Sequence, residues 1–213
     1  ELKTQTDLKV FPVLTSYFHQ IRAVLNETFK DIDITFCPRN DQEFSWCKNV
    51  VLELEKIKPG LVCAVQYRDP LGLGVSSLNS FPMSFRFPLI ADEHVAMHAR
   101  SKVICLPYFD GAFHAWGSSG RLQDSLAANA LPLVPKDTGM GHFLSQRTPD
   151  LVPQSFDPVV AARFVIEWLE APKKLPEPIT IADLIEFLLP QAPDKELTPY
   201  KYRFLIEIQI SLA

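Results

Sequence analysis

Helical periodicity alternates with short apolar runs along most of this chain, and that alternation most limits how the chain can fold. Apolar residues recur at helical spacing from Val13 to Lys30 and again from Glu43 to Ile57. The runs that follow, DITFC and LVCAVQY, have the length of buried strands. Because helices alternating with such strands bury a parallel sheet on both faces, we predict an α/β, Rossmann-like fold.

The alternation continues toward the carboxyl terminus. Residues 68–85 are rich in Pro, Gly and Ser and predict a long loop. After them we expect a strand at RFPLI, a helix over 92–100, a strand at KVICLP, a helix over 118–129, a strand at LPLV, a helical stretch over 140–145, and a further strand at LVP.

A well-marked helix then closes the predicted domain. Asp157 and Pro158 have the residue types of an N-cap and a first helical position for a helix through Leu169. Its expected inner face carries Val160, Phe164, Val165 and Trp168. The chain thus divides into an N-terminal helical extension (1–30), a Rossmann-like domain (31–171), and a C-terminal linker with helices at 182–189 and 199–212 (172–213).

The composition narrows the possible partners. The chain has 213 residues, 47% of them hydrophobic, and a formal net charge of −4 with acids and bases interspersed. Such a charge creates no field that would gather nucleic acid, so no nucleic-acid partner is expected. No apolar run reaches the length of a membrane span.

The cysteines and histidines predict no metal site. Cys63 and Cys105 stand inside apolar runs, whereas Cys37 and Cys47 are candidates for a disulfide in an oxidising compartment. His94 and His98 have the i, i+4 spacing of metal ligands, but without a visible third ligand the preferred interpretation is a solvated helix face.

The segment from Lys102 to Val134 has the pattern of an anion site. A strand ends at Pro107, a loop follows, and a helix begins near Ser118, where Ser118, Ser119 and Gly120 let backbone amides approach a ligand. Arg121 would add a guanidinium, whose planar fork suits a diphosphate.

Other side chains in this segment have two interpretations. Asp124 either accepts hydrogen bonds from ribose hydroxyls or serves the helix dipole. His114 and Trp116 either stack on the ligand or anchor the loop, and Asp110 with Gly111 is also a common turn pair.

These residues resemble glycosyltransferase family 90, which contains protein O-glucosyltransferases and capsule-associated xylosyltransferases. The similarity runs through Ala99–Lys102, Asp110–Gly111, Ser119–Leu122 and Asn129–Leu133. It implies the donor lobe of a two-lobed GT-B enzyme that binds a UDP-sugar as substrate without a metal or other cofactor. It also implies diphosphate contacts from Ser119 and Arg121, with Asp110 and Gly111 beside the donor pocket and Asp124 at the ribose.

The expected function is therefore nucleotide-sugar binding for transfer to a hydroxyl of a protein or glycan acceptor. The catalytic base is not visible in this sequence, so a second lobe or a protein partner would have to supply it. The alternative is a non-catalytic domain of the same fold that acts as a structural or interaction subunit. The resemblance implies the lumen of the secretory pathway; without it the cytoplasm is expected.

Overall fold

The structure is a computed structural model of the chain. It describes residues 18–25, 29–68, 81, 83–87, 91–109 and 120–177. All of these residues belong to one compact unit that ends at Pro178. The helices predicted at 182–189 and 199–212 lie outside the described residues.

A five-stranded sheet with the order β3-β2-β1-β4-β5 forms the centre of this unit. All four strand pairings are parallel, and Ile34 in the middle strand pairs with Cys63 on one side and Val103 on the other. This is the Rossmann strand order, so the predicted fold class is confirmed. The strands are β1 (Ile32–Phe36), β2 (Cys63–Arg68), β3 (Met83–Phe87), β4 (Ser101–Cys105) and β5 (Leu131–Leu133).

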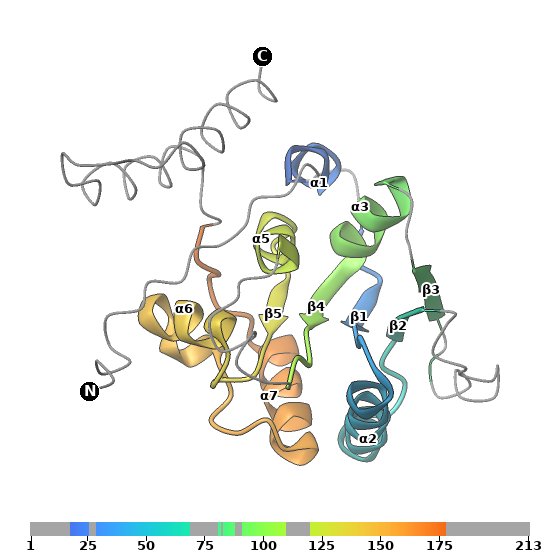
Figure 1. Cartoon of the computed structure of the whole chain (residues 1–213), viewed down its shortest axis with the longest axis vertical. Coiled ribbons are helices and arrows are strands. Elements are labelled where there is room, and N and C mark those ends of the chain that lie inside the picture. The colour runs from blue at the N-terminus through green and yellow to red at the C-terminus, as the bar shows by residue number, and fades with distance from the viewer. Residues whose placement is uncertain are drawn as a thin grey trace, which may run out of the picture. The chain divides into compact units, whose positions relative to one another are not determined.

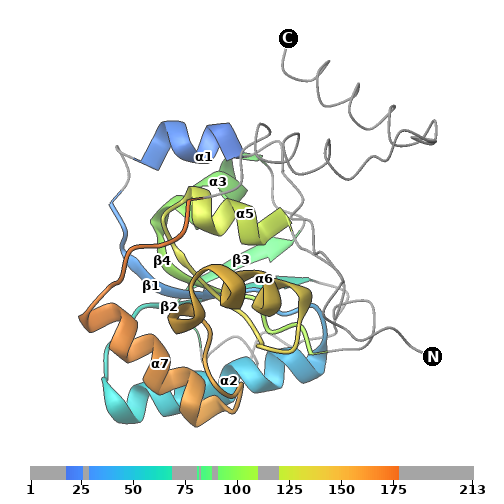
Figure 2. The ribbon, with the colours of Figure 1, turned by 90° about the vertical axis from the view of Figure 1, so that its left-hand side faces the viewer.

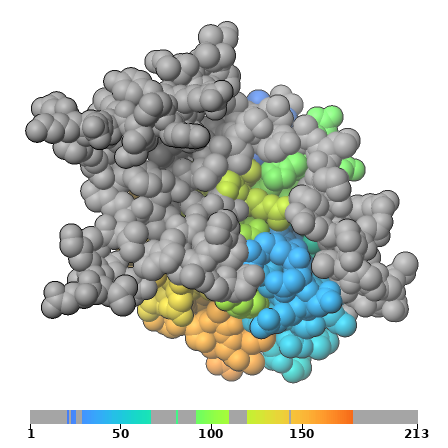
Figure 3. Space-filling view, in the orientation of Figure 1, coloured from blue at the N-terminus to red at the C-terminus, as the bar shows by residue number. Residues whose placement is uncertain are grey.

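Helices cover both faces of the sheet. The helices α1, α3 and α5 lie on one face, and α2 and α7 lie on the other (Figures 1 and 2). The surfaces of α2 and α7 are also adjacent in the space-filling view (Figure 3). The helical segments are α1 (Phe18–Leu25), α2 (Asp41–Ile57), α3 (Ala91–Arg100), α5 (Gly120–Ala127), α6 (Gly139–Arg147), the 3-10 turn η4 (Pro149–Leu151) and α7 (Pro158–Glu170).

The core lies between the sheet and these two helical layers. The central strands β1 and β4 contribute Ile32, Ile34, Val103 and Ile104, none of which is exposed to solvent. Both strands also carry polar residues, since β1 is IDITF and β4 is SKVIC, but the apolar positions of each strand are fully buried. Cys63 and Cys105 are buried here as free thiols, as their sequence context indicates.

Local signals explain where α2 and α7 begin. The Asn40 side chain accepts a hydrogen bond from the Glu43 amide, so α2 starts two residues before the predicted Glu43. Asp157 caps α7 through the Val159 amide, with Pro158 in the first turn, as predicted. The inner face of α7 is rotated from the prediction: Val160 is 37% exposed, and the buried residues are Ala161, Ala162, Val165, Ile166 and Trp168.

Three predicted elements are wrong in detail. Residues 83–85 were expected in a loop, but they form part of β3, because Met83–Phe87 pairs with Ala64–Arg68 of β2. The segment LVP is no strand; Leu151 ends the 3-10 turn η4. The N-terminal helix was expected to reach Lys30, but Phe29 and Lys30 are not helical, and Phe29, expected on its apolar face, is 84% exposed.

Candidate anion site at the carboxyl ends of β1 and β4

The chain leaves β1 and β4 in opposite directions, which creates a topological switch point. After β1 it enters α2 on one face of the sheet, and after β4 it continues to α5 on the other face (Figure 2). The Cys37 amide donates to the Cys105 carbonyl at 2.9 Å, so the two strands remain joined just beyond their ends. Ligands of open parallel sheets bind at such a divergence.

Arg39 stands at the start of α2 and is held by Glu43. The Glu43 carboxylate accepts hydrogen bonds from the Arg39 backbone amide, at 2.7 Å, and from its guanidinium. The Glu43 side chain is only 1% exposed, so this ion pair is shielded from water on its acidic side. The Arg39 guanidinium also lies 4.0 Å from the centre of the Tyr108 ring, within cation–π range.

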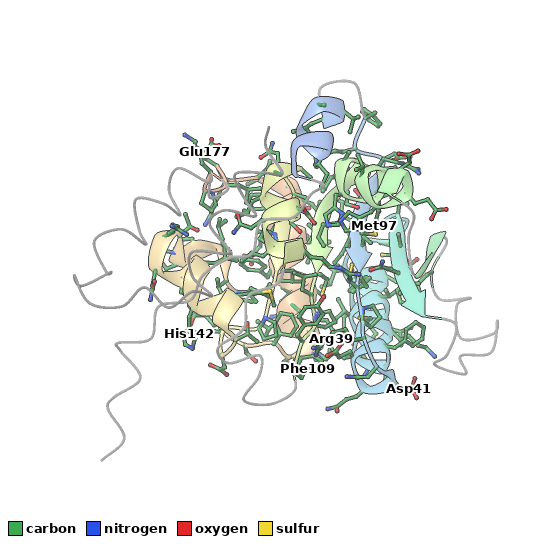
Figure 4. The ribbon with its side chains drawn as sticks, turned by 45° about the horizontal axis from the view of Figure 1, so that its top comes forward. Arg39, Asp41, Met97, Phe109, His142 and Glu177 are labelled. Carbon is green, nitrogen blue, oxygen red and sulfur yellow. The ribbon has the colours of Figure 1, made fainter. Side chains whose placement is uncertain are left out.

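Tyr108 and Phe109 follow the end of β4 and connect this site to an aromatic cluster. The ring of Trp46 stacks on Phe156 with centroids 4.5 Å apart, and Phe109 packs edge-on against both rings. The Trp46 indole also donates to the Phe156 carbonyl at 2.9 Å. Arg39 and Phe109 lie close together at this end of the sheet (Figure 4). Phe109 thus joins the end of β4 to the rings of Trp46 and Phe156.

Arg121 reaches the switch point from the first turn of α5. Its guanidinium hydrogen-bonds with the side chains of Tyr108 and Cys37, which follow β4 and β1. Burial opposes its charge, but Cys37 and Tyr108 beside it outweigh that effect and raise the pKa of Arg121. The structure therefore brings a permanent cation to the carboxyl ends of the two central strands.

Asp124 lies one turn further along α5 and faces α3. Its carboxylate is 1% exposed, and Oδ2 lies 3.0 Å from Nε2 of His94. His98, one turn along α3, is fully buried, and its Nδ1 lies 3.0 Å from the His94 carbonyl oxygen. The predicted solvated face of α3 is wrong, because α5 packs its Asp124 against these histidines.

The buried thiols near the site are poor nucleophiles. Burial raises the pKa of Cys37 and raises those of Cys47 and Cys105 still further. The reactive form of cysteine is the thiolate, which such a shift disfavours at neutral pH. Cys37 and Cys47, the candidates for a disulfide, are both free thiols in the structure.

Only part of the predicted anion site falls among the residues that the structure describes. Gly120, Arg121 and Asp124 all lie on α5, within the range 118–129 where a helix was expected. The remaining predicted site residues, Ser118, Ser119, Asp110, Gly111, His114 and Trp116, lie outside the described residues.

Sequence reasoning missed Arg39, Glu43 and Tyr108. Asn40 followed by Glu43 has the spacing of a capping box, and this signal marks a helix start directly after β1. A helix start at the end of a strand places Arg39 at the ligand-binding edge of a parallel sheet. No comparable local signal brings Tyr108 to Arg121, because that contact depends on how α5 packs.

Comparisons with known proteins leave the family of this chain undetermined. No protein-family model matches the sequence, and no curated protein matches it. Among the described residues, no helix combines the length and the apolar character that a membrane crossing needs.

Proposed function

We propose that this chain binds the nucleoside diphosphate of a UDP-sugar at the switch point between β1 and β4, as the donor-binding half of a glycosyltransferase. The observation that carries the proposal is the position of Arg121. Its guanidinium is fixed by Tyr108 and Cys37 at the edge where parallel sheets bind ligands.

The start of α5 adds a second contribution to anion binding. The first backbone amides of a helix have no acceptor within the helix, and they carry the positive end of its dipole. Gly120 is the first residue of α5, so these amides stand beside Arg121. In the proposed reaction, they and the guanidinium stabilise the charge that develops on the departing diphosphate.

The ribose contact of Asp124 remains a prediction within this proposal. Its buried carboxylate already accepts from His94 in one tautomer of that ring. A ribose hydroxyl would have to reach the same carboxylate beneath α5. Arg121 is therefore the residue on which the proposal is tested.

The acceptor and the base that deprotonates its hydroxyl belong to the other half of the proposed enzyme. The thiols at the switch point have raised pKa values and do not suit that role. A second lobe or a protein partner would supply the base. The alternative function, a non-catalytic domain of the same fold, needs no donor at all.

Calorimetry with UDP and UDP-sugars tests the donor site directly. We expect wild type to bind UDP and Arg121→Ala to bind it roughly tenfold to a hundredfold more weakly, because one charged hydrogen-bonding contact contributes about 1.5–3 kcal/mol. Arg121→Lys keeps the charge but loses the planar fork, so it should recover only part of the affinity.

Arg163→Ala is the matched control, since Arg163 is exposed on α7. It should bind UDP as wild type does. If folded wild-type protein shows no affinity for UDP or any UDP-sugar, the donor site is refuted and the non-catalytic alternative is favoured.

A further inference from the structure

Three potential metal ligands converge between α3 and α5. They are His94 and His98, one helical turn apart on α3, and Asp124 on α5. Their ligand atoms lie within 4.8 Å of one another, and the two imidazole rings have centroids 4.3 Å apart. A gathering of two imidazoles and a carboxylate under a helical layer is unusual unless the groups share a task.

His98 provides the observation that points to a ligand. Its Nδ1 is 3.0 Å from the His94 carbonyl oxygen, so Nδ1 carries the proton and donates it. The opposite nitrogen, Nε2, then presents a lone pair, is fully buried, and has no hydrogen-bond partner. An unsatisfied buried acceptor destabilises a fold, whereas a metal-ligating histidine commonly donates its other N–H to a carbonyl in this way.

The other two residues, His94 and Asp124, already have the spacing of metal ligands. His94 Nε2 and Asp124 Oδ2 are 3.0 Å apart. Zinc binds nitrogen and oxygen at about 2.0–2.1 Å in a tetrahedron, which places its ligand atoms about 3.3 Å from each other. The ligand atoms of all three residues lie within 4.8 Å of one another, so His98 stands beside this pair.

We propose that His94, His98 and Asp124 bind a divalent first-row transition cation, with Zn²⁺ as the best fit. Two imidazoles and one carboxylate favour zinc over Mg²⁺ or Ca²⁺, which prefer oxygen ligands. The proton between His94 and Asp124 leaves to solvent when the cation binds, and no oxidation or reduction takes place. Three protein ligands leave the fourth tetrahedral position to water or an anion.

Two charged groups of α5 lie near the proposed cation, and they act in opposite directions. Asp124 offsets one unit of the cation's charge, while the Arg121 guanidinium on the same helix opposes it. A positively charged neighbour favours an anionic fourth ligand such as hydroxide. The metal site does not depend on donor binding, because the observations that support it concern His98 and His94 and not Arg121.

Titration of tag-free, full-length protein with Zn²⁺, followed by calorimetry, tests this site. We expect one Zn²⁺ per chain in wild type, and binding at least about a hundredfold weaker in His98→Gln and Asp124→Asn, since even outer-shell changes cost 10- to 100-fold. His142→Gln is the matched control, because His142 is exposed on α6 away from α3 (Figure 4). It should bind as wild type does.

Co²⁺ substitution keeps the test decisive if a variant fails to fold. Bound Co²⁺ in wild type should show the visible absorption of a tetrahedral nitrogen–oxygen site, without thiolate charge-transfer bands. A thiolate spectrum, no stoichiometric Zn²⁺ binding, or unchanged binding by folded His98→Gln would each overturn the proposal. Arg121→Ala should still bind Zn²⁺, so failure of the donor site and failure of the metal site are distinguishable.

Discussion

The two ends of the parallel sheet differ in how far water reaches their ion pairs. At the amino ends of β1 and β4, Asp31 pairs with Arg100 at 2.6 Å and Asp33 with Lys102 at 2.7 Å, and the side chains of Asp31 and Lys102 are each 43% exposed. At the carboxyl ends, Glu43 is 1% exposed and is bound to Arg39.

The two ends therefore differ in how strongly water weakens their ion pairs. Exposed ion pairs contribute little to stability because water solvates each partner well. Buried charged groups are costly to leave unpaired, so a fold retains them where they hold other groups in place. We therefore expect the carboxyl end to be the more preorganised one. Four changes to the chain test this expectation through the free energy of unfolding.

The largest expected effect is at Glu43. Glu43→Ala removes the buried acceptor of the Arg39 amide and guanidinium and should lower the free energy of unfolding by about 3 kcal/mol, measured by urea denaturation. Glu43→Gln should lose less, because its amide oxygen still accepts the Arg39 amide. Equal stability of Glu43→Ala and wild type would remove the contrast between the two ends.

Gly141 tests how tightly the carboxyl end is packed. A Cβ at this position would lie 2.2 Å from the Pro135 carbonyl oxygen and 2.6 Å from that of Lys136, both of them backbone atoms after β5. Gly141→Ala should therefore destabilise the fold by about 2 kcal/mol in the same assay. Ser145→Ala on the same helix α6 should change stability far less.

At the amino end, the side chain of Lys30 is partly buried and has a lowered pKa. Burial, and secondarily Lys102, lower the pKa of Lys30 from 10.5 to about 8. Between pH 8 and 10.5 the unfolded chain thus binds the proton that the folded chain releases, so folded stability should rise with pH across this window. Relative to Lys30→Met, wild type should gain about 1.5 kcal/mol between pH 8 and 9.5. A flat difference would contradict the lowered pKa.

The smallest effect is expected at the exposed ion pair. Asp31→Ala leaves Arg100 in contact with water and should change the free energy of unfolding by no more than about 1 kcal/mol. High salt should reduce the difference further, since salt screens exposed charges. A loss as large as that of Glu43→Ala would show that both ends depend equally on their ion pairs.

Much of the local structure was predictable from near neighbours in the sequence. Asp157 and Pro158 marked the start of α7, and the apolar run around Cys105 marked β4. Residue periodicity gave wrong predictions where the structure depends on contacts between segments far apart in the sequence. Residues 83–85 pair with β2 despite their loop-like composition, and Val160 faces solvent because α7 rotates to pack on α2.

For the candidate site, local residue types were enough to predict a helix that begins near Ser118 after a buried strand and carries Arg121 in its first turn. The contacts of Arg121 with Tyr108 and Cys37, and of His94 and His98 with Asp124, depend on tertiary packing. His94 and Asp124 are 30 residues apart, and no local signal spans such a separation. The packing of α3 beside α5 brings them together.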